Sequence, residues 1–229
     1  MIIKKLNKYQ IVSLTDITAK QLRTLAKLFN EPFKKADSVL GGRRSIISAN
    51  FNGLGPIIIK QYMRGGFIKH IIKKRYMLFG KTRCQIEFDA LRKARKAGIN
   101  VPEPLAYITK GGLFYQGWLI TKEIKKKGNL AELRFSSKSQ ERELLRDLSL
   151  QISMLIENKI LHVDLHPGNV IVDQKERIYL LDFDKSRSYW GAKEMLKKKY
   201  LARWNRAITK HDLPEALRNV LFLDSKTIE

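Results

Sequence analysis

Three polar side chains in the second half of the chain have the types and the spacing that phosphoryl transfer requires. Asp164 is followed five residues later by Asn169, and Asp182 stands at the end of an apolar run a short hairpin further on. Phosphoryl transfer uses one carboxylate to accept the proton of the attacking hydroxyl, and a carboxamide with a second carboxylate to hold Mg²⁺ on the nucleotide. We therefore predict a kinase-type active site, with Asp164 as the base and Asn169 and Asp182 as metal ligands.

The same loop admits a second interpretation, a transition-metal centre. His162, Asp164 and His166 alternate along an extended segment and could converge on a zinc ion. The chain offers few further ligands for such a centre, because the other histidines are only His70 and His211. We favour a structural role for His162, and the role of His166, towards phosphate or substrate, stays open.

A lysine and a glutamate in the first half complete the expected ATP site. Residues 56–62 have the composition of a β-strand that Lys60 interrupts, and a lysine on a buried strand is costly unless an acid pairs with it. Residues 82–97 predict a helix with a capping box that begins at Thr82, and Glu87 lies one turn into it. We expect Lys60 and Glu87 to position the ATP phosphates. A solvated glutamate near a helix N-terminus is the alternative for Glu87.

Two further segments are expected to contact the nucleotide through their backbones. Gly41 and Gly42 link two predicted strands, and such a turn lets amides approach phosphates, although most glycine turns only reverse the chain. Glu123 and Ile124 end a predicted hairpin and are expected to form the hinge that binds the adenine edge. A polar connector, residues 125–135, follows.

These elements predict an α+β, bilobal protein-kinase-like fold. Residues 1–124 would form an N-lobe of about five antiparallel strands and one helix, preceded by a short leading helix within residues 18–30. Residues 125–229 would form a mainly helical C-lobe, with long helices predicted at residues 139–159 and 191–210.

The composition indicates an anionic partner. The chain of 229 residues carries 45 Lys and Arg against 22 Asp and Glu, a net charge of +23. Such a charge suits nucleic acid, an acidic membrane or a phosphorylated substrate, and we expect no nucleic acid because no nucleic-acid-binding module is recognisable. The single cysteine, Cys84, fits a reducing compartment and a structural role. We expect no signal peptide from residues 1–6, and no run of about 18 apolar residues occurs, so we expect membrane contact to be peripheral.

The loop at residues 162–169 resembles the catalytic loop of the protein-kinase superfamily and of aminoglycoside-type phosphotransferases. Val163 and His166 replace the Arg and Lys usual in protein kinases. The run that starts at Asp182 ends in Asp184 instead of glycine, and no Ala-Pro-Glu follows. These departures argue against a regulated activation loop and against a protein substrate.

Within that superfamily the chain is similar to the small bacterial lipopolysaccharide kinases, on four further stretches: residues 64–67, residues 82–83 with 87–88, residues 98–104 and residues 112–115. The resemblance implies transfer of the ATP γ-phosphate, with Mg²⁺, to a hydroxyl of 3-deoxy-D-manno-octulosonic acid (Kdo) on lipid A or a related anionic glycolipid. It places the protein peripherally at the cytoplasmic face of the inner membrane. A core-heptose kinase, or another small-molecule kinase, is the alternative within the same class. A catalytically inactive lipid-A-binding scaffold is the alternative of another class, against which the intact set of site residues argues.

Two basic segments are candidates for contact with anionic partners. Residues 64–81 interleave Lys and Arg with large apolar side chains, which suits an anionic lipid surface and equally an insertion that packs on its own core. Residues 191–210 form a strongly basic predicted helix, which suits a membrane, a substrate or ordinary C-lobe structure. The sequence leaves these alternatives open, together with the oligomeric state and the hydroxyl that is phosphorylated.

Overall fold

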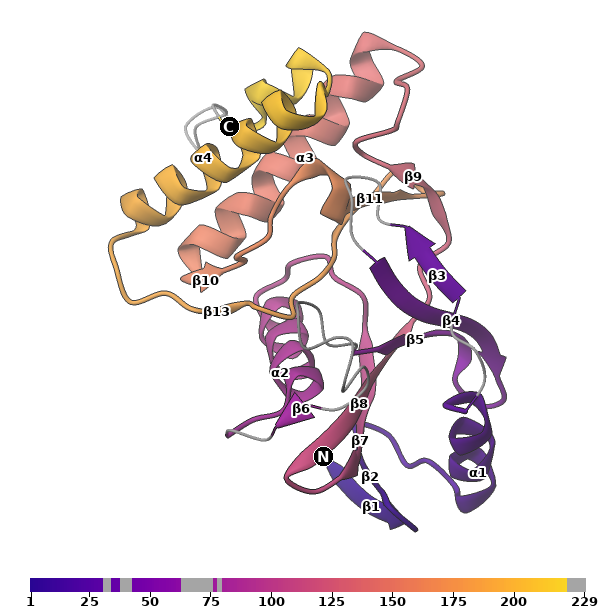
Figure 1. Cartoon of the computed structure of the whole chain (residues 1–229). Helices are drawn as coiled ribbons and strands as arrows, with labels where there is room; N and C mark the ends of the chain where they lie inside the picture. Colours follow the sequence, from indigo (N-terminus) through magenta and orange to yellow (C-terminus); the bar gives the residue numbers. More distant parts are fainter. Residues whose placement is uncertain (31–33, 38–42, 63–75, 78–79, 222–229) are drawn as a thin grey trace. The chain divides into compact units, whose positions relative to one another are not determined.

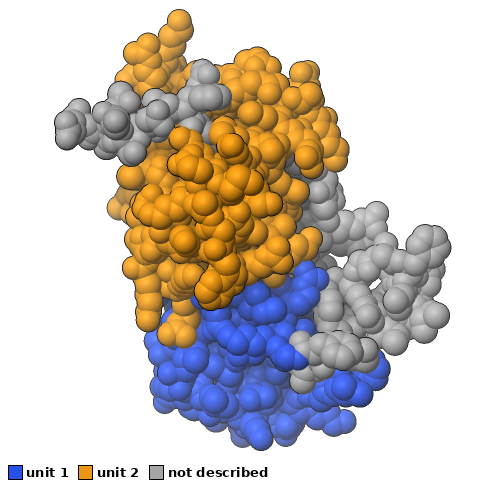
Figure 2. All heavy atoms as spheres, turned by 90° about the vertical axis from the view of Figure 1, so that its left-hand side faces the viewer, with its two compact units in different colours: residues 1–38, 42–89, 103–123 blue, residues 39–41, 90–102, 124–229 orange. Residues whose placement is uncertain are grey.

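A computed structural model of the protein describes residues 1–30, 34–37, 43–62, 76–77 and 80–221. The chain divides into two units, coloured separately in Figure 2. Unit 1 comprises residues 1–38, 42–89 and 103–123, and unit 2 comprises residues 39–41, 90–102 and 124–229. We propose that these units correspond to the two predicted lobes.

An antiparallel sheet forms the framework of unit 1 (Figure 1). Its order is β1-β2-β7-β8-β5-β4-β3, and β6 pairs with β8, so the described residues contribute eight strands where about five were expected. The additional strands are β1, β2 and β6. The edge strand β1 faces solvent in part, so its sequence lacks a strict alternation of apolar and polar residues. The strand bounds are β1 (Ile2–Leu6), β2 (Tyr9–Ser13), β3 (Lys34–Asp37), β4 (Arg43–Phe51), β5 (Gly55–Gln61), β6 (Tyr76–Met77), β7 (Pro104–Gly111) and β8 (Phe114–Lys122).

Helix α1 (Ala19–Leu28) covers one face of this sheet (Figure 1). Thr18 caps the helix: its hydroxyl accepts from the Gln21 N–H and the Gln21 side chain accepts from the Thr18 N–H. Leu22 and Leu25 of α1 belong to the same buried apolar cluster as Ile57 of β5. Because side chains alternate along a strand, the face of β5 that carries Lys60 points away from this cluster.

Helix α2 (Arg83–Lys96) begins directly after Thr82, whose hydroxyl accepts from the Gln85 N–H at 3.3 Å. Its single thiol, Cys84, is fully buried, and a Cβ added at Gly117 of β8 would lie 2.9 Å from the Cys84 sulfur. Glycine at position 117 therefore lets the helix approach the sheet closely. Burial raises the pKa of Cys84 to about 11, which keeps the thiol protonated and agrees with a structural role.

Unit 2 contains two long helices, α3 (Lys138–Glu157) and α4 (Lys193–His211), which lie side by side (Figure 1). Their bounds lie within two residues of the predicted ones. Every fourth residue of α4 from Leu196 to Ile208 is buried, which leaves the basic side chains on its outer surface. No helix in the described part of the chain combines the length and the apolar character needed to cross a membrane.

Short strands and turns complete unit 2. β9 (Lys126–Asn129), β11 (Val170–Asp173) and β12 (Ile178–Leu180) form a three-stranded sheet of order β12-β11-β9. The predicted polar connector therefore contains a strand, which its lysine-rich sequence conceals. β10 (Ile160–Leu161) pairs with β13 (Arg187–Ser188), and two 3-10 helices, η2 (Pro167–Asn169) and η3 (Glu215–Leu221), are present.

Candidate functional site

The structure brings Lys60 and Glu87 together within unit 1. β5 lies between β4 and β8, and the Lys60 ammonium donates to both Glu87 carboxylate oxygens, at 2.7 Å and 3.1 Å. Glu87 is only 3% exposed, so α2 presents its carboxylate to the strand and not to solvent. A carboxylate removed from water needs such a cation, and this requirement fixes the position of the ammonium.

Tyr62 is a third member of this cluster, and the sequence analysis missed it. Its hydroxyl donates to the Glu87 carboxylate, and the Lys60 ammonium lies 5.2 Å from the centre of its ring. The Arg83 guanidinium lies 5.7 Å from the same ring. Tyr62 follows Lys60 by two residues on the same side of the extended chain, and this spacing was the signal available in the sequence.

The β11–β12 hairpin of unit 2 places the two predicted metal ligands at one end. Val170 pairs with Leu180, and the Leu181 N–H donates to the Asn169 carbonyl at 2.8 Å. Asn169 therefore lies opposite Leu181, the neighbour of Asp182 in the chain. Asp182 has a φ of 67°, in the left-handed region that costs a non-glycine residue about 1 kcal/mol. Backbone strain of this kind is concentrated at functional positions.

The side chain of Asn169 is oriented by hydrogen bonds within its own loop. Its Nδ2 donates to the Asp164 carbonyl at 2.9 Å and to His166 Nε2 at 3.1 Å. Because an amide nitrogen only donates, His166 Nε2 accepts and the imidazole carries its proton on Nδ1. The Asn169 Oδ1 lies on the other side of the amide. An amide oxygen and a carboxylate are the hard donors that Mg²⁺ prefers, so the side-chain types of Asn169 and Asp182 fit the predicted ion.

His162 is a buried structural residue in this loop. Its Nε2–H donates to the Leu181 carbonyl at 2.8 Å, and its ring meets the Phe183 ring edge-on at 4.5 Å. The His162 N–H donates to the Tyr200 hydroxyl, which donates to the Ile160 carbonyl. Burial lowers the pKa of His162, against opposing effects of the Leu181 carbonyl and nearby carboxylates, so the ring is neutral.

The alternative of a transition-metal centre receives no support from the described part of the chain. No group of three His, Cys, Asp or Glu side chains there is arranged to hold a metal ion. His162 directs its Nε2 to a backbone carbonyl, as described above, and His166 directs its Nε2 to Asn169.

The carboxylate of Asp164 forms an ion pair with Arg203 of α4, a contact that the sequence analysis did not predict. His166 Nε2 lies 3.9 Å from the same carboxylate oxygen, Oδ1. Arg203 and Asp164 are 39 residues apart, and no local sequence pattern links them. The proposed base is thus held by a guanidinium that is itself partly exposed.

Asn129 of β9 supports the loop from the other side. Its Nδ2 donates to the Gly168 carbonyl at 2.9 Å, and its Oδ1 accepts from the Ala131 N–H at 3.0 Å. β9 pairs with β11, which brings Asn129 opposite Ile171. The strand inside the predicted connector therefore contributes a residue that binds the predicted catalytic loop.

The predicted hinge continues the β5–β8 ladder. The Glu123 N–H donates to the Pro56 carbonyl at 3.0 Å, and the Glu123 carboxylate accepts from the Ser48 hydroxyl. The Glu123 N–H is therefore already hydrogen-bonded, so an adenine edge bound at this segment would have to form hydrogen bonds with other backbone groups. Gly41 and Gly42 lie outside the described residues, as does most of the basic segment 64–81.

Comparison with known proteins points to one family. The model of the "Lipopolysaccharide kinase (Kdo/WaaP) family" matches residues 35–221. A protein of Vibrio vulnificus named "3-deoxy-D-manno-octulosonic acid kinase" is 31% identical over 69% of this chain and 67% of its own length. A protein of the same name from Photobacterium profundum is 30% identical over 73% of this chain and 70% of its own length.

Among solved structures, the chain is similar to "Structure of the Cydia pomonella Granulovirus kinase, PK-1". The two are 17% identical, the alignment covers 76% of this chain and 61% of the other, and the TM-score is 0.47.

The Lys60–Glu87 pair generates a stability prediction. Lys60→Met should lower the free energy of unfolding by about 3 kcal/mol, because the Glu87 charge stays buried without its cation. The double variant Lys60→Met, Glu87→Gln should recover part of this loss, because no charge then remains buried. Urea unfolding measures both. A double variant no more stable than Lys60→Met would contradict the account.

The neutral state of His162 generates a pH prediction. In the unfolded chain His162 binds a proton near the ordinary pKa of 6.5, whereas burial lowers its pKa in the folded chain. The unfolded state therefore binds more protons as the pH drops, and the free energy of unfolding falls. His162→Gln keeps an amide donor for the Leu181 carbonyl and removes this proton uptake. Its free energy of unfolding should therefore decline less steeply between neutral pH and about pH 5.

His211→Gln is the matched control, because it also removes one imidazole from unit 2. Chemical unfolding at a series of pH values gives the slopes. Equal changes of slope in the two variants, or no change in His162→Gln, would contradict the assignment.

Proposed function

The chain belongs to the lipopolysaccharide kinase (Kdo/WaaP) family and is an ATP-dependent phosphotransferase, and on that basis we propose that its acceptor is a hydroxyl of Kdo in Kdo-lipid A. The two relatives described above carry the name of that sugar acid. We further propose that the protein acts peripherally at the cytoplasmic face of the inner membrane, where an anionic glycolipid would present this hydroxyl.

The Arg203–Asp164 ion pair is the observation that carries the choice of acceptor. Arg203 lies on a stripe of exposed basic residues along α4, spaced four, three and four apart: Lys199, Arg203, Arg206 and Lys210. No acidic residue of α4 lies between Lys199 and Lys210. A sugar acid on a phosphorylated lipid offers carboxylate and phosphate groups that complement it, whereas a neutral sugar does not.

The proposed catalytic roles follow from the hydrogen bonds of each residue. Arg203 engages Oδ1 of Asp164, so we assign Oδ2 as the oxygen that accepts the proton of the attacking hydroxyl. His166 and the Asn129-bound loop keep the backbone around Asp164 in place. Positioning of this kind supplies most of the rate enhancement in phosphoryl transfer, which requires little covalent chemistry from the protein.

The remaining groups bind the nucleotide in this proposal. Lys60, oriented by Glu87, contacts the α- and β-phosphates, and the Glu123 carbonyl with the Ile124 backbone meets the adenine edge. Asn169 Oδ1 and the Asp182 carboxylate would hold Mg²⁺, which would supply positive charge to offset that of the nucleotide phosphates.

An acceptor assay tests the function. The protein, supplied with Mg²⁺ and γ-labelled ATP, should phosphorylate Kdo₂-lipid A in preference to a heptosylated core that lacks a free Kdo hydroxyl. Asp164→Asn should reduce turnover by about a thousandfold or more while nucleotide binding persists, because only the proton acceptor is lost. Preferred labelling of heptose would identify a core-heptose kinase. Equal turnover by Asp164→Asn would reject the assigned base.

Arg203 provides a separate prediction about acceptor recognition. Arg203→Gln should lower kcat/KM for Kdo₂-lipid A by about tenfold to a hundredfold, the range of a charged hydrogen bond, while KM for ATP stays unchanged. Arg203→Lys should restore only part of the loss, because an ammonium cannot bind a carboxylate through two parallel bonds. A change confined to KM for ATP would show that Arg203 does not act on the acceptor.

A further inference from the structure

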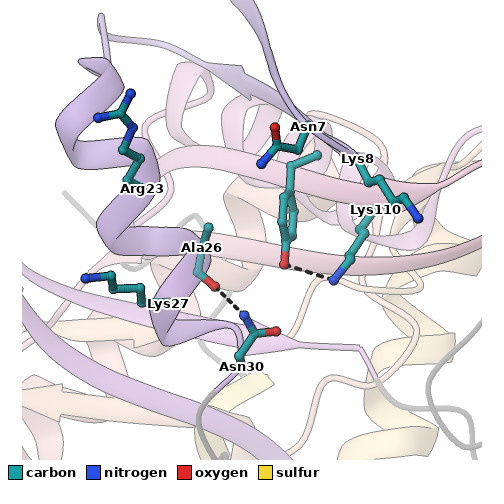
Figure 3. A pocket seen from close by; sticks show the side chains of 8 residues that line it. Asn7, Lys8, Arg23, Ala26, Lys27, Asn30 and Lys110 are labelled. Atoms are coloured by element: carbon teal, nitrogen blue, oxygen red, sulfur yellow. Dashed lines mark hydrogen bonds between the residues drawn. The ribbon is translucent and has the colours of Figure 1, made fainter.

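Unit 1 contains a hollow away from the Lys60–Glu87 cluster, with a volume of about 380 Å³ (Figure 3). It is formed by the turn between β1 and β2, the C-terminal half of α1 and the end of β7. Four of its eight lining residues are cationic and none is acidic: the cations are Lys8, Arg23, Lys27 and Lys110, and the others are Asn7, Tyr9, Ala26 and Asn30.

Among the described residues, no acidic side chain offsets the positive charge of this hollow. None of the four cations forms an ion pair with another described residue. Arg23 and Lys27 are four residues apart on one helix, a like-charge spacing that destabilises a helix by about 0.2–0.5 kcal/mol. The side chain of Asn30 donates to the Ala26 carbonyl at 3.1 Å, which covers one of the negative carbonyl groups at the end of α1. These features favour an anion in the hollow.

Tyr9 supplies a neutral donor at the same place. The Lys110 ammonium donates to the Tyr9 hydroxyl at 3.1 Å and lies 4.8 Å from its ring (Figure 3). Because an ammonium cannot accept, the hydroxyl accepts in this bond and keeps its own proton for another partner. No described residue accepts a hydrogen bond from this hydroxyl, although Tyr9 is only 8% exposed. A phosphate oxygen would satisfy it.

Exposed apolar side chains lie close to the hollow along the same hairpin. Leu113, in the turn that joins β7 to β8, is 64% exposed, and Phe114, the first residue of β8, is 43% exposed. The register pairs Lys110 with Tyr9 on one side and with Gln116 on the other, so the turn begins just beyond the hollow. Cations beside exposed apolar side chains are typical of a surface that binds the head-group region of a membrane.

We propose that this hollow binds the phosphate of an anionic lipid head group while Leu113 and Phe114 contact the acyl boundary. The cations and the Tyr9 hydroxyl provide donors for phosphate oxygens, and a soluble phosphate ester would leave the apolar turn unused. The hollow is thus a membrane-docking site, separate from the residues that carry the phosphotransfer. The inference does not rest on the identity of the acceptor sugar.

Vesicle sedimentation, without ATP or acceptor, tests the site. The full chain should bind phosphatidylcholine vesicles that contain phosphatidylglycerol, and bind pure phosphatidylcholine vesicles weakly. Arg23→Gln with Lys27→Gln should weaken binding by about twenty-five-fold, since each cation near the surface contributes about fivefold. Leu113→Gln should weaken it by about fivefold through lost apolar burial.

The matched control is Arg142→Gln with Arg146→Gln, an exposed pair at the same spacing on α3 that makes the same change in net charge. It should bind vesicles within about twofold of the wild type, because diffuse attraction of a chain with a net charge of +23 depends weakly on any one pair of charges. If both double variants weakened vesicle binding equally, the effect would come from the overall charge, and the proposed site would be rejected. Binding of glycerol phosphate in the hollow without binding to vesicles would overturn the lipid assignment.

Discussion

A buried negative charge constrains the architecture of unit 1. Glu87 keeps its carboxylate almost entirely out of water, so Lys60 and Tyr62 must meet it from the central strand β5 and the residue that follows it. Ile57 and Ile59 of β5 are buried in the core on the α1 side of the sheet. Because side chains alternate along the strand, Lys60 points to the opposite face. The position of the ammonium that we assign to the ATP phosphates thus follows from packing on the opposite face of the sheet.

The sequence predicted those parts of the site in which a local pattern or an energetic cost identifies the partner. A lysine among isoleucines requires an acid, and this requirement, together with the position of Glu87 one turn into a predicted helix, pointed to Glu87. Asn169 and Asp182 were expected near each other because only a short hairpin separates them, and the pairing of Val170 with Leu180 brings their backbones to one end. Helix boundaries also followed from local signals, since a cap such as Thr18 acts on its immediate neighbours.

Contacts between distant segments were not predictable in the same way. Arg203 belongs to a basic helix in which every cation is equivalent by sequence, and only the packing of α4 selects the one that reaches Asp164. Asn129 lies in a lysine-rich stretch without strand character, and its role depends on pairing between β9 and β11. The β1–β2 hairpin was overlooked for a related reason. An edge strand has fewer positions that must be apolar, so its pattern is weak.

The burial of Cys84 has a practical consequence for studying this protein. The chain has no second cysteine, and the thiol pKa of about 11 leaves few thiolates to react at neutral pH. The native protein should therefore react very slowly with thiol-directed labels. A cysteine introduced on the surface, for example in the turn that contains Leu113, would carry a fluorophore or spin label as a single reporter of its surroundings.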